Sequence, residues 1–390
     1  MPIDEQFMRR VLELARAGVG LASPNPAVGA VVVDVSGREA GCGTHTYDGV
    51  KHAEIIALQQ AGHAAHSGTL YLNLEPCSHQ GRTGPCADAV IAAGIRRVVC
   101  SMQDPNPLVS GQGFAKLCAA GVSVEAGLFE AEAKKLNESF AKYIRLHKPL
   151  VTLKSAMSLD GKIADATKPG AELRSEDRAA MPATEGARSG YHWITGEVAR
   201  AHVHQLRHRS DAILAGVGTV MADDPLLTDR SGLPRRRRLL RVILDSYLRI
   251  PLESRIIQTA ENDVLVVCSN AEEAAWRALD AKGIRVQRIA AMADGRPDFA
   301  AIVKSLGELE IASLLIEGGA LVNAAALASG EVDKIFLYYA PKIFGADAVP
   351  FIAGEGLKGK AQRVERYELH RFGEDFALEG YLRDPYTLAA

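Results

Sequence analysis

Long apolar runs are absent from this chain of 390 residues. No stretch approaches the roughly 20 apolar residues that a membrane helix requires, and Met1–Arg10 lacks the basic start and apolar core of a secretory signal. A strong charge of one sign is absent too, since 45 Lys and Arg stand against 47 Asp and Glu. We therefore expect a cytoplasmic protein that neither enters a membrane nor binds nucleic acid through a general positive field.

Cysteine is also scarce. Six cysteines in a chain of this length do not indicate a disulfide framework, which belongs to small secreted domains. Four of them stand among apolar or small residues and are interpreted as ordinary buried thiols: Cys42, Cys100, Cys118 and Cys268. Only Cys77 and Cys86 have neighbours that suggest chemistry.

The length and composition indicate more than one folded domain. A single hydrophobic core stops growing at roughly 250–300 residues, and 47% hydrophobic with 24% charged residues is an ordinary globular balance. A charged helical segment ends at Lys148-Pro149 and an apolar strand follows at once. We place the boundary there, with a first domain at 1–147 and a second at 148–390.

Both halves alternate helical and strand patterns, which favours two α/β domains. In the first half we expect helices at 5–18, 52–61, 85–93 and 130–145, and strands at 28–33, 69–74 and 97–100. In the second half we expect strands at 150–154, 212–215, 241–244, 264–267, 313–316 and 334–339.

Two segments interrupt the second half. Residues 165–190 are polar without a clear period, which indicates a long surface insertion. The run Arg235–Arg238 beside Pro234 is compatible with a phosphate contact, but a solvated loop is the more common structure for such a run.

One group of residues carries chemistry. His52 and Glu54 open an expected helix, Cys77 follows an expected strand, and Cys86 stands nine positions further on. One imidazole and two thiolates are ligands that zinc accepts, and three protein ligands leave the fourth tetrahedral position for water. Zinc lowers the pKa of bound water to about 7–9, which makes a nucleophile available near neutral pH. Glu54 would then move protons as the general acid/base.

Each part of this group also has an ordinary explanation. A His-x-Glu triplet is common, and two cysteines nine positions apart can be core thiols or belong to a structural zinc site. A structural site usually has four protein ligands, and the sequence offers no convincing fourth. Together the residues favour a catalytic site of the zinc-deaminase type, whose signature is H-x-E followed by P-C-x-x-C, although the gap between the cysteines is longer here.

The longer gap, at 76–86, combines with the segments 23–29 and 52–54. These three segments closely resemble the deaminase half of the bifunctional riboflavin-biosynthesis deaminase/reductase family. Further segments resemble that family's reductase domain: 153–163, 193–195, 216–228, 316–319 and 340–342. The resemblance implies an α/β protein, with a cytidine-deaminase-like three-layer α/β/α domain before a dihydrofolate-reductase-like α/β domain.

The resemblance also implies the reactions. The first domain would use one zinc ion per chain to hydrolyse the 2-amino group of 2,5-diamino-6-ribosylamino-4(3H)-pyrimidinone 5′-phosphate. The second would use NADPH to reduce the ribosyl group to ribityl, giving 5-amino-6-(5-phosphoribitylamino)uracil. The family further suggests a homodimer or homotetramer that assembles through the second domain.

Residue roles follow by position in the family's motifs. Asn25 and His45 would contact the deaminase substrate, although Asn25 between two prolines is equally typical of a turn. The reductase substrate contacts would be Lys154, Tyr191, Arg207, Leu227, Arg230 and Glu317. The cofactor contacts would be Ala156, Trp193, Thr219, Asp223, Ser246, Gly318 and Gly319. The glycine pair precedes an expected helix, whose N-terminal N–H groups can bind a phosphate. Without the resemblance, Arg207 and Arg230 would be interpreted as solvated charges.

The second half departs from the family pattern in one place. A long insertion precedes Trp193, and Tyr191 stands where the family has a substrate-contacting serine. Two rival hypotheses therefore stay open: a deaminase whose second domain is a noncatalytic nucleotide-binding module, and a deaminase that acts on a base in tRNA or another nucleic acid. The near-neutral charge and the reductase-like half argue against the second rival.

Overall fold

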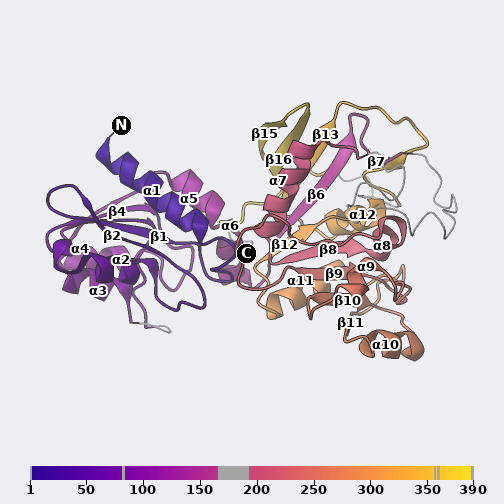
Figure 1. Ribbon diagram of the computed structural model, residues 1–390, viewed down its shortest axis with the longest axis horizontal. Helices are drawn as coiled ribbons and strands as arrows, with labels where there is room; N and C mark the ends of the chain where they lie inside the picture. Colours follow the sequence, from indigo (N-terminus) through magenta and orange to yellow (C-terminus); the bar gives the residue numbers. More distant parts are fainter. Residues whose placement is uncertain (1, 81–83, 166–192, 355–356, 358–360, 388–390) are drawn as a thin grey trace.

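The computed structural model describes residues 2–80, 84–165, 193–354, 357 and 361–387 (Figure 1). The first half folds around a five-stranded sheet and the second around a nine-stranded sheet, which confirms the expected pair of α/β architectures. Apart from Asp165, the insertion expected at 165–190 lies outside the described residues. Within the described ranges, no helix is long and apolar enough to cross a membrane.

The first half has three layers, with the sheet in the middle. Its strand order is β2-β1-β3-β4-β5, in which β1 is antiparallel to both neighbours and the last three strands are parallel. Helices α1 and α5 cover one face, and α2, α3 and α4 cover the other (Figure 1). The bounds are α1 Ile3–Ala17, β1 Gly29–Val33, β2 Glu39–Thr44, α2 Ala53–Ala61, a 3₁₀ turn Gly62–Ala65, β3 Thr69–Leu74, α3 Cys86–Ala92, β4 Arg97–Met102, α4 Gln112–Ala119, β5 Ser123–Ala126, α5 Glu130–Leu136 and α6 Glu138–Leu146.

Strand β1 shows why these layers form. Its side chains alternate, so Val31 and Val33 pack with Val11 of α1, whereas Ala30 and Val32 enter the core on the side of α2. Burying one such aliphatic side chain contributes about 1.5–3 kcal/mol. A strand that is apolar on both faces therefore needs a helix on each side.

The single helix expected at 130–145 is wrong in one respect, because Asn137 divides it into α5 and α6. The Asn137 side chain is buried and accepts a hydrogen bond from the N–H of Ala27 at 2.8 Å. Its amide also donates to the Ala27 carbonyl oxygen at 3.2 Å. The helix breaks where this side chain fastens the segment that leads into β1.

The second half has a mixed sheet in the order β11-β10-β9-β8-β12-β6-β13-β16-β15. The first seven strands are parallel, and β16 and β15 continue the sheet in antiparallel fashion. The carboxyl ends of the parallel strands therefore meet at one edge. The bounds are β6 Leu150–Ser158, β7 Lys162–Ala164, α7 Glu197–His208, β8 Ala212–Gly216, α8 Val217–Asp223, β9 Leu240–Leu244, α9 Arg255–Gln258, β10 Val264–Cys268, α10 Glu273–Asp280, β11 Arg285–Arg288, α11 Phe299–Glu308, β12 Ser313–Ile316, α12 Ala320–Ala328, β13 Lys334–Ala340, β14 Val349–Pro350, β15 Arg366–Phe372 and β16 Asp375–Tyr381.

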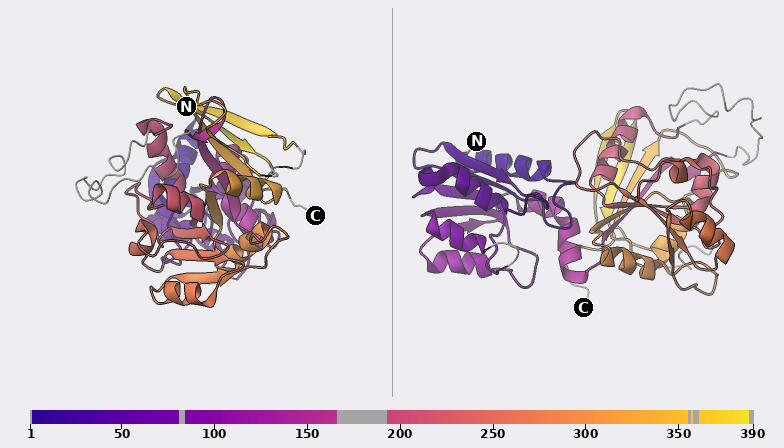
Figure 2. Two further views of the ribbon diagram at one scale, coloured as in Figure 1. Left: turned by 90° about the vertical axis from the view of Figure 1, so that its right-hand side faces the viewer. Right: turned by 60° about the horizontal axis from the view of Figure 1, so that its bottom comes forward.

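The two halves meet along α6, which lies between them in Figures 1 and 2. Lys142 of α6 forms a 2.6 Å ion pair with Asp333, and their side chains are only 4% and 3% exposed. Lys334 at the start of β13 pairs with Glu138 of α6, also at 2.6 Å. Charges this deeply buried require their partners, so the junction is a fixed contact.

Candidate active sites

His52, Cys77 and Cys86 come together at the start of two helices. His52 precedes α2, Cys86 is the first residue of α3, and Cys77 follows β3. Their ligand atoms lie within 4.8 Å of one another, with His52 Nδ1 3.1 Å from Cys86 Sγ and 3.5 Å from Cys77 Sγ. Around one tetrahedral zinc ion such ligand atoms stand about 3.5–3.8 Å apart, since Zn–N is about 2.0 Å and Zn–S about 2.3 Å. The donor set and its spacing fit zinc.

Close backbone packing positions the two chain segments that carry His52 and Cys77. At Gly43 on β2, a Cβ would stand 2.2 Å from the carbonyl oxygen of Ala53, so only glycine lets the start of α2 approach the sheet this closely. At Gly113 on α4, a Cβ would stand 2.0 Å from the carbonyl oxygen of Pro76. The first contact sets the position of His52, and the second sets that of the segment leading into Cys77.

The two thiols share one interaction. A hydrogen bond from Cys86 lowers the pKa of the Cys77 thiol to about 4, and the same contact raises the pKa of Cys86. Holding both groups as thiolates at neutral pH requires a cation in place of the shared proton. A Zn²⁺ ion meets this need, because two thiolates neutralise its charge.

Glu54 lies in the first turn of α2, two residues beyond His52, and is 4% exposed. Burial raises the pKa of its carboxyl, because the charged form loses its hydration. A carboxyl of this kind beside a metal site can accept a proton and release it again.

Asn25 and His45 form a hydrogen-bonded pair next to the ligands. His45 Nδ1 is 2.9 Å from the carbonyl oxygen of Lys51, so Nδ1 donates and Nε2 of the neutral ring accepts. The Asn25 amide Nδ2 donates to that Nε2 at 3.0 Å. The His45 ring stands edge-on to His52, with 5.4 Å between ring centroids. The structure thus places both residues beside the zinc group, and their contact with a substrate stays a prediction.

A second polar site lies in the second half, around Glu317. This residue follows β12 and accepts hydrogen bonds from Arg207 Nε at 2.7 Å and Nη2 at 3.2 Å, and from Lys154 Nζ at 3.4 Å. Burial opposes ionisation of the carboxyl, but Arg207 and Lys154 outweigh it and lower the Glu317 pKa to about 2. Arg207 Nη1 also donates to the Thr228 carbonyl oxygen at 3.0 Å, next to Leu227, whose φ of 52° is left-handed. Three residues predicted to contact substrate therefore form one cluster, with Leu227 close by in the chain.

Several residues predicted to contact the cofactor lie near the carboxyl edge of the parallel strands. Gly318 and Gly319 join β12 to α12, and a Cβ on Gly319 would lie 3.6 Å from Thr219 Oγ1 on α8. Ser246 follows β9, and its carbonyl oxygen accepts N–H groups from the segment after β10. Asp223 ends α8, while Ala156 lies within β6. Open α/β sheets bind ligands at this edge, and a helix N-terminus offers N–H groups to phosphate.

The other predicted residues are less closely placed. Arg230 is exposed, and its backbone N–H is 3.3 Å from His204 Nδ1. Trp193 is 44% exposed, with the Arg200 guanidinium 5.0 Å from its ring centroid. Tyr191 lies outside the described residues. Among the cysteines, Cys100 and Cys268 are buried as expected, Cys42 is only partly buried, and the expectation is wrong for Cys118, which is exposed on α4.

Two buried polar residues on the deaminase side were not found from the sequence. Glu75 is 3% exposed and accepts backbone N–H groups from Asp104, Gly111, Gly113 and Phe114. Asn73 is fully buried and binds the N–H of Gly29 and the carbonyl oxygen of Ala27. Their signal is visible in retrospect, because both interrupt an apolar strand pattern directly before Pro76-Cys77.

A third cluster has metal-like spacing but different chemistry. Glu368, His370 and Glu379 on β15 and β16 hold their ligand atoms within 4.8 Å. Lys135 Nζ lies 2.9 Å from both glutamates, and Lys334 Nζ lies 2.8 Å from Glu379. Ammonium groups already neutralise these carboxylates, so the cluster is an ion-pair network between the halves.

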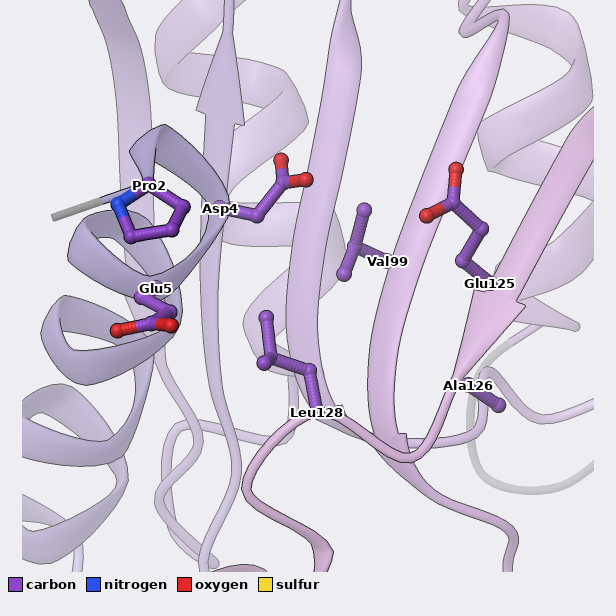
Figure 3. A pocket seen from close by; sticks show the side chains of 7 residues that line it. All are labelled: Pro2, Asp4, Glu5, Val99, Glu125, Ala126 and Leu128. Atoms are coloured by element: carbon purple, nitrogen blue, oxygen red, sulfur yellow. The ribbon is translucent and has the colours of Figure 1, made fainter.

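A hollow of about 240 Å³ opens between the start of α1 and strands β4 and β5 (Figure 3). Asp4 and Glu125 belong to its lining, and Arg97 pairs with each of them at 2.8 Å. None of the zinc-group residues lines this hollow. Its acidic character is balanced locally, and it is separate from the candidate site.

Comparison with known proteins covers both halves. Residues 1–102 match the family model of the cytidine and deoxycytidylate deaminase zinc-binding region, and residues 149–378 match that of the RibD C-terminal domain. The riboflavin biosynthesis protein RibD of Aquifex aeolicus is 39% identical over 378 residues, covering 96% of this chain and 98% of that protein. The protein of the same name from Escherichia coli is 37% identical over 388 residues, with 96% and 98% covered.

Two solved structures are similar over the whole chain. RibD of Acinetobacter baumannii is 33% identical with a TM-score of 0.79, covering 97% of this chain and 98% of that one. A diaminohydroxyphosphoribosylaminopyrimidine deaminase/5-amino-6-(5-phosphoribosylamino)uracil reductase from Thermotoga maritima is 34% identical with a TM-score of 0.74 and the same coverage.

Proposed function

The chain belongs to the RibD family of bifunctional riboflavin-biosynthesis deaminase/reductases, and on that basis we propose how its residues divide the two reactions. It is a pyrimidine deaminase and a phosphoribosylaminouracil reductase. We assign residues 1–147 to the deaminase domain and 148–390 to the reductase domain. The family-model matches at 1–102 and 149–378 support this division.

In the deaminase domain, His52, Cys77 and Cys86 hold one zinc ion per chain. The convergence of their three ligand atoms within 4.8 Å is the observation that carries this assignment. Zinc bound there supplies a water activated for attack near neutral pH. Glu54 takes a proton from the attacking water and delivers it to the amino group, which leaves the ring carbon as ammonia.

Asn25 and His45 position the pyrimidine ring for this step. The hydrogen bond to His45 Nε2 turns the Asn25 amide so that its nitrogen faces the histidine and its oxygen faces away. That oxygen can accept a hydrogen bond from an N–H on the pyrimidinone edge. The substrate we propose is 2,5-diamino-6-ribosylamino-4(3H)-pyrimidinone 5′-phosphate.

In the reductase domain, bound NADPH would supply the hydride that C1′ of the ribosyl group receives. The bond from C1′ to the ring oxygen breaks, and that oxygen keeps the electron pair and gains a proton, which leaves a ribityl chain. Glu317 orients the Arg207 guanidinium, and a guanidinium suits a sugar phosphate through forked hydrogen bonds. Lys154, Tyr191, Leu227 and Arg230 complete the proposed substrate contacts.

The cofactor would lie along the carboxyl edge of the sheet. Gly319 at the N-terminus of α12, with Gly318 before it, leaves space and N–H groups for the phosphates. Ala156, Trp193, Thr219, Asp223 and Ser246 are the remaining proposed contacts. We propose NADPH over NADH from family membership.

A coupled assay tests both reactions in one vessel. The purified chain receives the diamino substrate and NADPH, while ammonia and NADPH absorbance are followed together. We expect ammonia first and NADPH oxidation that depends on it. Ammonia without NADPH oxidation would favour a noncatalytic second domain, and base conversion in single-stranded RNA would favour a nucleic-acid substrate. Release of no ammonia would refute the deaminase assignment.

We also propose that copies of the chain assemble through the second domain, as a homodimer or homotetramer in the cytoplasm. Strand β15 ends the nine-stranded sheet, and its Tyr367 and Leu369 are 63% and 67% exposed. An edge strand with exposed apolar side chains is a favourable surface for pairing. A monomer in sedimentation experiments across the micromolar range would contradict this assembly.

A further inference from the structure

The run Arg235–Arg238 is not a fully solvated loop, because its side chains bind other groups of the protein. From first to last, the four side chains are 16%, 20%, 28% and 60% exposed. Arg235 pairs with Asp229 at 2.9 Å, Arg237 donates to the Glu310 carbonyl oxygen at 2.6 Å, and Arg238 pairs with Glu261. These three therefore bind groups of their own domain.

Arg236 binds the first domain instead. Its backbone N–H donates to the Gly20 carbonyl oxygen at 2.8 Å, and its Nη1 donates to the Ser23 carbonyl oxygen at 2.9 Å. The guanidinium carbon is 3.5 Å from the ring centroid of Tyr47, and Nε is 3.4 Å from Asp48 Oδ1. One arginine thus contacts two separate segments, 20–23 and 47–48.

A second contact of the reductase domain holds the same region. Ser23 Oγ donates to Asp211 Oδ2 at 2.8 Å, and that oxygen also accepts the N–H groups of Ala312 and Ser313. Gly20 has a φ of 80°, and a Cβ there would stand 2.8 Å from Cε1 of His208. The segment 20–23 is therefore packed against the reductase domain and cannot shift on its own.

The segments that Arg236 holds lead directly into the deaminase pocket. Asn25 follows Ser23 by two positions, and Tyr47 follows His45 by two. The Tyr47 N–H donates to the Leu21 carbonyl oxygen at 3.0 Å, so the segments 20–23 and 47–48 are also hydrogen-bonded to each other. Arg236 therefore contacts both of the chain segments that carry Asn25 and His45.

We propose that Arg236 of the reductase domain is a positioning residue for the deaminase reaction. It sets the relative placement of the chain segments that carry Asn25 and His45, and so the geometry in which the pyrimidine ring is held. The inference rests on the proposed deaminase function of the His52, Cys77 and Cys86 group. It makes the deaminase reaction depend on a side chain that belongs to the other enzyme.

The test compares Arg236→Ala and Arg236→Lys with Arg238→Ala in the full chain. Arg238 is the matched control, because it belongs to the same run but pairs within its own domain. Three quantities are measured: kcat and KM for ammonia release, bound zinc, and NADPH oxidation when the deaminated intermediate is supplied. We expect Arg236→Ala to raise the deaminase KM about tenfold, the effect of losing one charged hydrogen bond.

Zinc content and NADPH oxidation should stay at wild-type values in Arg236→Ala. Lysine keeps the charge but loses the planar fork and the stacking surface, so Arg236→Lys should lie between wild type and alanine. Should Arg236→Ala not fold, Tyr47→Leu removes the ring that the Arg236 guanidinium stacks on, and Ser23→Ala removes the neighbouring hydrogen bond to Asp211. Both variants should raise the deaminase KM.

Two results would overturn the inference and leave the deaminase function standing. One is a deaminase KM in Arg236→Ala within about twofold of wild type. The other is an equal loss of ammonia release and NADPH oxidation in a folded Arg236→Ala chain, which would show that Arg236 has no specific effect on the deaminase pocket. A wild-type chain that binds zinc but releases no ammonia would instead refute the proposed function, and the inference with it.

Discussion

At Glu317, the favourable interaction of a buried carboxylate with its cationic neighbours can be measured directly. Burial opposes its ionisation, yet Arg207 and Lys154 lower its pKa from 4.5 to about 2. At about 1.4 kcal/mol per pH unit, this corresponds to about 3 kcal/mol of favourable interaction. Because the pKa is lower in the folded state, the stabilisation is complete above pH 4.5 and is lost as the pH falls through about 2.

Glu317→Gln replaces the carboxylate by a neutral group of the same shape. We expect it to lower the free energy of unfolding of the second domain by about 3 kcal/mol at pH 7 and by about 1 kcal/mol at pH 3. Comparing variant with wild type at each pH cancels the titration of all other groups. Glu308→Gln, at an exposed position on α11, should change neither value.

Urea unfolding followed by tryptophan fluorescence isolates the relevant domain. The chain has two tryptophans, Trp193 and Trp276, and both belong to the second half. The signal therefore reports that half even if the domains unfold separately. An unchanged midpoint for Glu317→Gln at pH 7, or an equal loss at both pH values, would refute the reasoning.

Three further predictions concern the two sites. Glu54→Gln should retain zinc by elemental analysis and lose ammonia release, whereas Cys86→Ala should lose the metal; ammonia from the first variant would exclude the role given to Glu54. Removing zinc with a chelator should stop ammonia release and leave NADPH oxidation on the deaminated intermediate intact, and loss of both would place a metal requirement in the reductase domain. Arg241, with a side chain 1% exposed, pairs with Asp263 at 2.8 Å and donates to the Leu226 carbonyl oxygen at 3.2 Å. Arg241→Met should therefore lower the free energy of unfolding of the second domain by about 3–5 kcal/mol in the fluorescence assay and raise the reductase KM. A wild-type free energy of unfolding and a wild-type KM would contradict a structural role for the buried Arg241–Asp263 pair.

The parts of the fold that could be predicted are those with one dominant physical cause. Strands β3 and β12 were expected at 69–74 and 313–316, the bounds that the structure shows, because strands that are buried on both faces have mostly apolar sequences. Strands β2 and β15 were not predicted. Their sequences contain Gly or charged residues among the apolar ones, and β15 is mostly exposed at the sheet edge. Neither strand therefore shows a mostly apolar run.

The sites divide in the same way. The grouping of His52, Cys77 and Cys86 could be predicted because few residue types bind zinc and their order matches a known pattern. The partners of Arg236, Asp211 and Glu75 could not. Ser23 and Asp211, for example, are 188 positions apart, and nothing local in either segment indicates the other.

The buried ion pairs along α6 bear on how such an enzyme could be encoded. Suppose that the two halves were made as separate polypeptides. Water would then fully hydrate the charges of Lys142 and Glu138 on one piece and of Asp333 and Lys334 on the other. That hydration would have to be stripped again before the pieces could rejoin, at a cost of several kcal/mol per ion. Fission of the gene would thus yield weakly associating products unless these four positions changed with it.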